Sequence, residues 1–195
     1  MTPEIITKPP RSVPIVGKHA DFLISFWHAW TAPSPCLLLE LFAKTTSQLS
    51  RRYVLSLLLD RYPNAETGLS RWDHILLRNV HKHGPRISQV IAHTIGGSYP
   101  SFDRVGDLWL RSRLFRLAPP GNKGALVTIL RDDNNLRQEK ITLTQLGSDV
   151  LAGRTNALDV SIRSDWIGGV RIAASKPHIW VRTTDGLAQR STTHK

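Results

Sequence analysis

Cysteine is nearly absent from this chain, since Cys36 is the only one among 195 residues. The chain can therefore form no internal disulfide and no zinc site built from several cysteines. Cys36 itself falls in an apolar segment, 36–44, that predicts a buried helix. Long apolar runs are missing too: no segment approaches the roughly 18–20 consecutive apolar residues of a membrane-spanning helix. These absences, and four prolines in place of a secretory leader, predict a cytoplasmic protein without a membrane partner.

The common catalytic signatures are also missing. No nucleophile elbow, Walker loop or dinucleotide fingerprint occurs in the sequence. The paired acids Asp132 and Asp133 lie in a turn-rich segment, and Asp107 suits a helix cap. The histidines at positions 74, 81 and 83 lack the i, i+4 spacing of a zinc helix, so a surface helix explains them. We therefore expect no enzymatic activity, no cofactor and no metal.

Acidic residues are scarce: 15 Asp and Glu stand against 26 Lys and Arg, which gives a formal net charge of +11 and a pI near 10.5. Arginine supplies 18 of these 26 basic residues, and its planar guanidinium suits bidentate contacts with phosphate or guanine. A polyanion, DNA above all, is the expected partner. The excess is spread evenly, +5 over residues 1–100 (11 against 6) and +6 over residues 101–195 (15 against 9). A protein that is basic without binding a polyanion is the alternative.

Proline, glycine and apolar spacing divide the chain into five parts. Residues 1–18 predict a disordered arm, and residues 19–63 predict a helical subdomain. The linker-like segment PNAETGLS separates this subdomain from a domain at 70–152. Short strands at 153–183 predict a β appendage, and residues 184–195 predict a disordered tail. The expected fold class is α+β.

Residues 70–152 predict the order helix, short helix, helix, strand, turn, strand, helix. Ser70 and Asp73 have the form of a capping box before the first helix, 71–83. The third helix, 107–118, places its leucines on one side and Arg113 and Arg116 on the opposite side. This order is typical of a winged helix, in which the third helix lies in the DNA major groove beside a β-hairpin wing.

The stretch KITLTQLGSDVLAG at 140–153 changes from strand-like alternation to helical spacing within one residue. Thr144 is predicted to cap the helix that leaves the wing. Gly147 lies inside that helix, where glycine costs up to about 1 kcal/mol relative to alanine, so we expect a neighbouring element to pack closely against it. Gly153 is predicted to end the helix.

Several motifs resemble those of an uncharacterised bacterial family, known only as a domain of unknown function. The matching elements, in order between about residues 22 and 180, are WHAWTAPSP, GLSRWDHILL, VGDLWLRSRL, ITLTQLGSDVLAG and SDWIGGVRI. The LTxxGxxVL junction also resembles the end of the wing in bacterial winged-helix regulators, where the next helix leads towards a dimer interface. The resemblance implies a winged-helix-like fold and transfers no established activity.

This chain departs from that family in three respects. We expect it to lack the further N-terminal domain that members typically carry, because only a short proline-rich arm precedes the matching elements. It has His28 where they have an acidic residue, and IWVR where their last strand ends in an acidic residue. No role that depends on those features is implied for this chain.

The helix 107–118 and the wing carry the candidate DNA contacts. Arg113 and Arg116 are predicted to reach bases or phosphates. Positioning contacts to phosphate are predicted for five further residues: Arg104, Arg111, Lys123, Arg131 and Arg137. We expect a nonenzymatic DNA-binding protein, in a regulatory role, with the helices of 19–63 serving packing or homodimerisation. The alternative is a protein-interaction module that binds no DNA.

The segment DWIGGVRI supports two interpretations. In the first, Trp166 packs into a core and Gly168 and Gly169 form a turn or bulge before a strand. In the second, exposed backbone at the paired glycines contacts a ligand or partner. The first is favoured, because tryptophan beside paired glycine is frequent at core corners.

Overall fold

The computed structural model of the protein describes residues 17–46, 49–97, 103, 105–119, 121, 124–132, 135, 138–160, 164–173 and 176–191. Three of the candidate contact residues lie outside the described residues: Arg104, Lys123 and Arg137. Residues 1–16 of the predicted arm and 192–195 of the predicted tail lie outside them as well.

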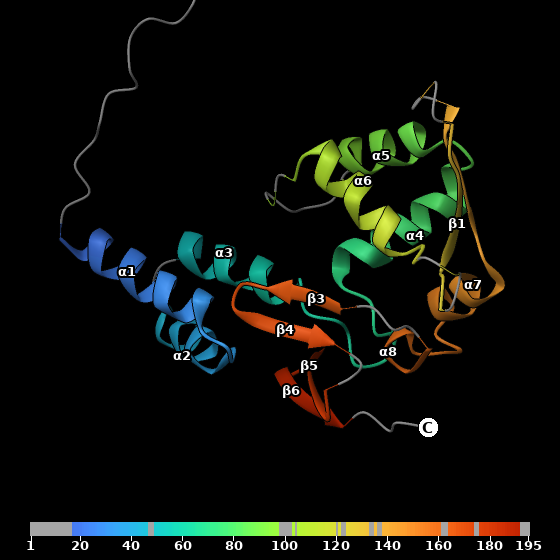
Figure 1. Cartoon of the computed structure of the whole chain (residues 1–195). Helices are drawn as coiled ribbons and strands as arrows, with labels where there is room; N and C mark the ends of the chain where they lie inside the picture. Colours follow the sequence, from blue (N-terminus) through green and yellow to red (C-terminus); the bar gives the residue numbers. More distant parts are fainter. Residues whose placement is uncertain are drawn as a thin grey trace, which may run out of the picture.

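Helices and short antiparallel strand pairs make up the described chain, which confirms the predicted α+β class (Figure 1). Three helices come first: α1 (Lys18–Thr31), α2 (Cys36–Lys44) and α3 (Leu49–Leu59). The next elements are α4 (Arg71–His83), α5 (Ile87–Gly96), α6 (Asp107–Arg116), β1 (Val127–Leu130), β2 (Lys140–Leu143) and α7 (Gln145–Leu151). The last are α8 (Ala157–Val160), β3 (Ser164–Ile167), β4 (Val170–Ala173), β5 (His178–Thr183) and β6 (Gly186–Ser191).

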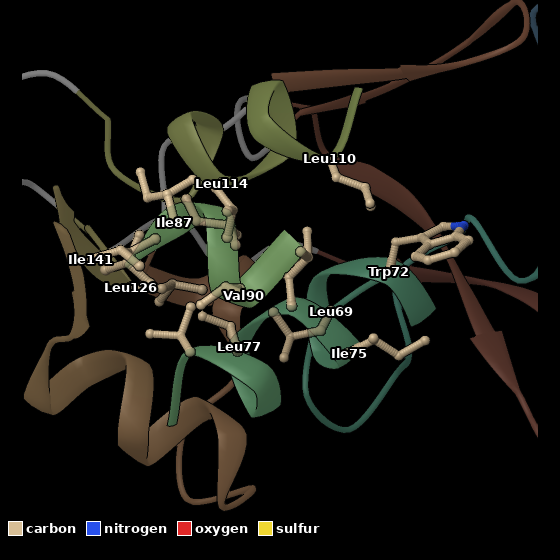
Figure 2. Close-up of a cluster of buried hydrophobic side chains, with 14 of the residues drawn as sticks. Leu69, Trp72, Ile75, Leu77, Ile87, Val90, Leu110, Leu114, Leu126 and Ile141 are labelled. Atoms are coloured by element: carbon tan, nitrogen blue, oxygen red, sulfur yellow. The ribbon is translucent and has the colours of Figure 1, made fainter. Parts of the chain in front are cut away.

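Helix α4 runs through the largest apolar cluster, which we call the main core (Figure 2). Ser70 caps this helix as predicted, because its Oγ accepts a hydrogen bond from the Asp73 N–H at 3.1 Å. The main core is filled largely by leucine, isoleucine and valine side chains from α4, α5, α6, β1, β2 and α7. The 17 buried residues of the main core are Leu69, Trp72, Ile75, Leu76, Leu77, Val80, Ile87, Val90, Ile91, Leu110, Leu114, Leu117, Leu126, Val127, Ile141, Val150 and Ala157.

Strands β1 and β2 form an antiparallel hairpin that is tied to the connection between α4 and α5. The Ile141 N–H donates to the carbonyl oxygen of Pro85 at 2.6 Å. The Ile87 N–H donates to the carbonyl oxygen of Glu139 at 3.1 Å. Residues 85–87 thus add a short third strand-like segment to the free edge of β2, and this fixes α5 beside the hairpin.

The junction between β2 and α7 confirms three local predictions. Thr144 caps α7 by accepting a hydrogen bond from the Gly147 N–H at 2.9 Å, and its hydroxyl donates to the Ala125 carbonyl at 2.7 Å. Gly147 is buried against the chain before β1, so that a Cβ atom there would overlap the carbonyl oxygen of Leu126. Gly153 follows the helix with a φ of +73°, a conformation that side chains disfavour.

Two antiparallel hairpins follow, β3–β4 and β5–β6. They enclose a second apolar cluster that includes Tyr62, Ile167 and Ile179. The prediction of a disordered tail from residue 184 is wrong for residues 186–191, which form β6. The segment GLAQRS carries little apolar alternation, and it becomes a strand because its backbone pairs with β5 along six residues while Leu187 packs on the cluster.

Helices α1, α2 and α3, which we call the N-terminal helices, pack around a small cluster of three buried residues: Ala29, Leu38 and Leu55. The burial predicted for Cys36 is wrong, because this first residue of α2 is exposed and its Sγ accepts a hydrogen bond from the Ser34 hydroxyl at 3.1 Å. Among the described residues, no helix has both the length and the apolar character needed to span a membrane.

Candidate nucleic-acid interface and adjoining cleft

Helix α6 carries most of the described candidate contact residues. Leu110 and Leu114 anchor one side of it in the main core. The helix begins after Gly106, and the predicted cap by Asp107 is wrong. Within the described part of the chain, the carboxylate of Asp107 accepts the N–H of the adjacent Leu108, at 2.8 Å, and does not cap the helix.

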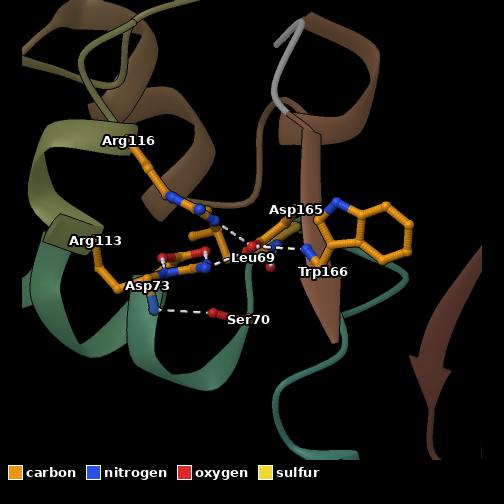
Figure 3. A network of polar contacts seen from close by, with 8 residues as sticks. Leu69, Ser70, Asp73, Arg113, Arg116, Asp165 and Trp166 are labelled. Atoms are coloured by element: carbon orange, nitrogen blue, oxygen red, sulfur yellow. Dashed lines mark hydrogen bonds and ion pairs between the residues drawn. The ribbon is translucent and has the colours of Figure 1, made fainter. Parts of the chain in front are cut away.

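Arg113 lies in the interior, with 14% of its side chain exposed (Figure 3). Its Nε and Nη2 donate to the two carboxylate oxygens of Asp73 at 3.1 and 2.7 Å, and its Nη1 pairs with Asp165 of β3. Burial acts to lower the pKa of the guanidinium, but Asp73 and Asp165 outweigh it and the pKa is raised above the ordinary arginine value. Arg113 is therefore a permanently charged link between α4, α6 and β3.

Arg116 shares the carboxylate of Asp165 with Arg113. Its side chain is 52% exposed, so Arg116 remains accessible to solvent while it pairs with Asp165. Asp165 also accepts the Trp166 N–H at 2.9 Å, as Figure 3 shows. A single aspartate on β3 thus holds both arginines that were predicted to reach DNA bases or phosphates.

Arg111 and Arg131 lie on a different side of α6. Arg111 forms a bidentate pair with Glu139, with Nη2–Oε1 and Nε–Oε2 distances of 2.8 and 3.2 Å. The ring of Phe115 is contacted by both guanidiniums, whose carbon atoms lie 4.5 Å (Arg111) and 4.8 Å (Arg131) from its centroid. This stack joins α6 to the end of β1. The four described candidate arginines therefore form two pairs, one facing β3 and one facing the hairpin.

A cleft of about 240 Å³ opens beside Arg113 and Arg116. Four of the six tryptophans line it, from α1, α4, α6 and β3, and we call it the tryptophan cleft: Trp30, Trp72, Trp109 and Trp166. Arg61 also lines this cleft. Sequence reasoning did not find this site, because its members are spread over more than 130 residues; the high tryptophan content was the one available signal.

The inner wall of the cleft is an aromatic and ionic assembly. Trp109 meets Trp72 edge to face, with centroids 6.0 Å apart and an interplanar angle of 75°. Asp103 accepts the indole N–H of Trp72 at 3.0 Å and pairs with Arg61 at 2.9 Å. Among the described residues, no atom accepts a hydrogen bond from the buried Nε of Arg61.

The outer wall of the cleft shows where the DWIGGVRI segment lies. The predicted packing of Trp166 in a core is wrong, because this side chain is 63% exposed. The predicted glycine turn is confirmed: Gly168 and Gly169 join β3 to β4, and the Gly169 N–H donates to the Trp30 carbonyl at 2.8 Å. A Cβ atom at either glycine would overlap the backbone at the end of α1. The turn lies against the end of α1, while Trp166, two residues before it, lines the cleft and stays exposed.

The described residues hold no group of three or more histidine, cysteine or acidic side chains arranged to bind a metal ion. His83 and His93 stack, with ring centroids 3.7 Å apart, but they are only two.

No family model matches the chain, and neither a curated protein nor a solved structure does. The geometry of this chain alone must carry a functional proposal.

Proposed function

We propose that the protein is a nonenzymatic DNA-binding protein of the winged-helix type. The observation that carries this proposal is the attachment of residues 85–87 to β2. This attachment joins the α4–α5 connection to the β1–β2 hairpin, and α6 packs on the same main core through Leu110 and Leu114. Winged helices use such an arrangement to bring the third helix to the major groove and the hairpin to the DNA backbone. The net charge of +11 supports a polyanionic partner.

The two pairs of arginines support different roles. Arg131 is exposed, and Arg111 keeps 35% of its side chain exposed beside it; both are proposed to contact phosphates. Arg116 is a further proposed contact, on the side of α6 that faces β3. Arg113 is proposed as a positioning residue, because its donors are already used by Asp73 and Asp165.

The proposal is tested by fluorescence anisotropy with a mixed-sequence DNA duplex between about 50 and 200 mM salt. We expect log K to fall linearly with log salt, with a slope of about −0.9 for each phosphate that the protein neutralises. Arg131→Gln is expected to weaken binding to all sequences and to reduce the salt slope by about 1.

The matched control is Arg154→Gln. Arg154 is an exposed arginine paired with Asp149 after α7, and α7 begins at the end of β2 opposite the Leu130–Lys140 end of the hairpin. This variant is expected to bind DNA like the wild type, apart from the loss of one unit of net charge. Absence of binding by the wild type at about 50 mM salt rejects the proposal.

A second candidate function is self-association through the N-terminal helices. Six of the ten exposed large hydrophobic residues in the described chain lie on them: Leu23, Ile24, Trp27, Leu37, Leu49 and Val54. Apolar surface of this kind marks interaction sites, and a symmetric dimer uses one patch twice. Analytical ultracentrifugation is expected to show a dimer at about 10 µM that Trp27→Ser weakens. A wild-type monomer at that concentration counts against a homodimer and in favour of a different partner or none.

A further inference from the structure

We propose that the tryptophan cleft is a binding site for a small planar aromatic anion. This inference goes beyond DNA binding and does not depend on it. Its walls come from four separate parts of the chain, so only the folded protein creates the site. The cleft lies at the junction of the N-terminal helices, α6 and β3, and places of this kind, between packed units, are where small-molecule sites are commonly found.

The aromatic character of the ligand follows from the walls. Trp109 is held by its edge-to-face contact with Trp72, and Trp166 stands at the rim with 63% of its side chain exposed. An exposed indole that buries little surface contributes little to folding. A planar ring that stacks on Trp166 and contacts Trp109 would bury that surface and gain favourable aromatic contacts.

The negative charge of the ligand follows from the arginines. Arg61 and Arg113 already lie within 6 Å of the Trp109 ring, at 5.9 and 5.7 Å from its centroid. Aspartates pair with all three arginines, but Arg116 is the most exposed charged side chain that lines the cleft, at 52% against 25% for Asp165. An ammonium ligand attracted to the tryptophan faces would therefore meet this guanidinium and be repelled by it. The cleft therefore differs from an aromatic cage for cations.

The guanidinium of Arg116 is available to a carboxylate or phosphate, whereas the Nε of Arg61, which has no acceptor among the described residues, is buried away from a ligand in the cleft. Arg116 is half exposed and shares Asp165 with Arg113. A ligand anion that replaces Asp165 at Arg116 leaves Asp165 paired with Arg113, so the exchange exposes no unpaired charge in the interior.

Isothermal titration calorimetry on the full chain tests this inference with three ligands that share one ring system: indoleacetate (an anion), indoleacetamide (neutral) and tryptamine (a cation). We expect indoleacetate to bind with a Kd below about 1 mM. The amide is expected to bind at least about ten-fold more weakly, since it cannot form a charge-assisted pair with arginine. Tryptamine is expected not to bind. Adenosine monophosphate (an anion) and adenosine (neutral) provide the same comparison for a phosphate in place of a carboxylate.

Two variants locate the site. Arg116→Gln is expected to weaken anion binding by about ten-fold, and Trp166→Leu by a similar factor, while the melting temperature stays close to that of the wild type. Arg154→Gln removes the same charge outside the cleft and is expected to leave anion binding unchanged. Equal affinity for the anion and its neutral partner, or anion binding that neither cleft variant weakens, overturns the inference. So does the absence of binding by both anions at about 5 mM. DNA binding by the same preparations is measured separately, so the two proposals can fail independently.

Discussion

The N-terminal helices and the unit formed by α4–α7 differ most in what they bury. The main core around α4 holds 17 buried apolar residues, whereas the cluster among α1, α2 and α3 holds three. Six of the ten exposed large hydrophobic residues in the described chain belong to the N-terminal helices. Burial of apolar surface is the main source of stability. The N-terminal helices therefore depend on contacts outside their own cluster.

Those contacts lie at the end of α1. Trp30 packs at the edge of both the small N-terminal cluster and the cluster between the C-terminal hairpins. Its carbonyl accepts the Gly169 N–H. The β3–β4 hairpin in turn is held to α6 by Asp165. The β3–β4 hairpin thus connects the α4–α7 unit, which has a large buried core, to the N-terminal helices, which bury few residues of their own.

Removal of the Arg113 guanidinium, which links α4, α6 and β3, is expected to cause the largest loss of unfolding free energy. Arg113→Ala leaves Asp73, which has 5% of its side chain exposed, without its bidentate partner. Breaking a buried pair in this way costs about 3–5 kcal/mol of unfolding free energy, to be measured by urea denaturation. The exposed pair of Arg154 with Asp149 provides the control, and Arg154→Ala is expected to cost no more than about 1 kcal/mol. Similar losses in the two variants would mean that the main core does not depend on Arg113.

Truncation of one buried leucine to alanine in each core compares how much the stability of the whole protein depends on that core. Leu114→Ala in the main core is expected to cost about 2–5 kcal/mol of global stability. Leu38 is equally buried, but Leu38→Ala is expected to act mainly on local opening of the N-terminal helices. Hydrogen exchange measures both effects: protection falls throughout α4–α7 in the first variant and mainly in α1–α3 in the second. Equal loss of protection in both units after Leu38→Ala contradicts the comparison.

A methyl group at the glycine turn is expected to separate the two units. In Gly169→Ala the new Cβ would overlap the Thr31 carbonyl oxygen, so the hairpin must move away from α1. We expect a loss of about 1–3 kcal/mol and faster hydrogen exchange in α1. At Gly96, the last residue of α5, a Cβ atom would have no atom of the described residues within 4 Å, and Gly96→Ala is expected to be neutral or stabilising by up to about 1 kcal/mol. Unchanged exchange in α1 of the Gly169 variant would show that the turn does not hold this helix.

Acidification is expected to weaken α4 by the smallest amount. Burial, followed by the charges of Arg78 and Arg182, lowers the pKa of His74 below its usual 6.5. As the pH falls through about 6.5, the unfolded chain takes up a proton at this histidine before the folded chain does, so stability falls until the lowered folded pKa is reached. Above about pH 7 the imidazole is neutral in both states and contributes nothing. Urea denaturation at about pH 7.5 and 5.5 is expected to show a smaller difference in His74→Gln than in the wild type; equal differences contradict the role of His74.

The sequence predicted correctly those helices and caps that depend on residues close together in the chain. The ranges 36–44 and 71–83 coincide with α2 and α4, because each has a distinct start and an apolar stripe of helical period. The caps at Ser70 and Thr144 depend on residues three positions apart. Cys36 and Trp166 were predicted to be buried and are exposed, because burial depends on which distant elements pack nearby.

The α+β class, the order of helices and strands from residue 70 to 152 and the close contact at Gly147 could all be predicted from the amino-acid order, because propensity, capping and glycine spacing act over a few residues. How the arginines of α6 are used could not be predicted, because it depends on distant residues that folding brings to them. Asp73, Glu139 and Asp165 lie between 28 and 52 residues from the arginines that they pair with. Their pairing separates Arg113 from solvent and leaves Arg116 beside four tryptophans. Charge can be counted along a chain, but its availability to a partner depends on which carboxylates the fold brings to it.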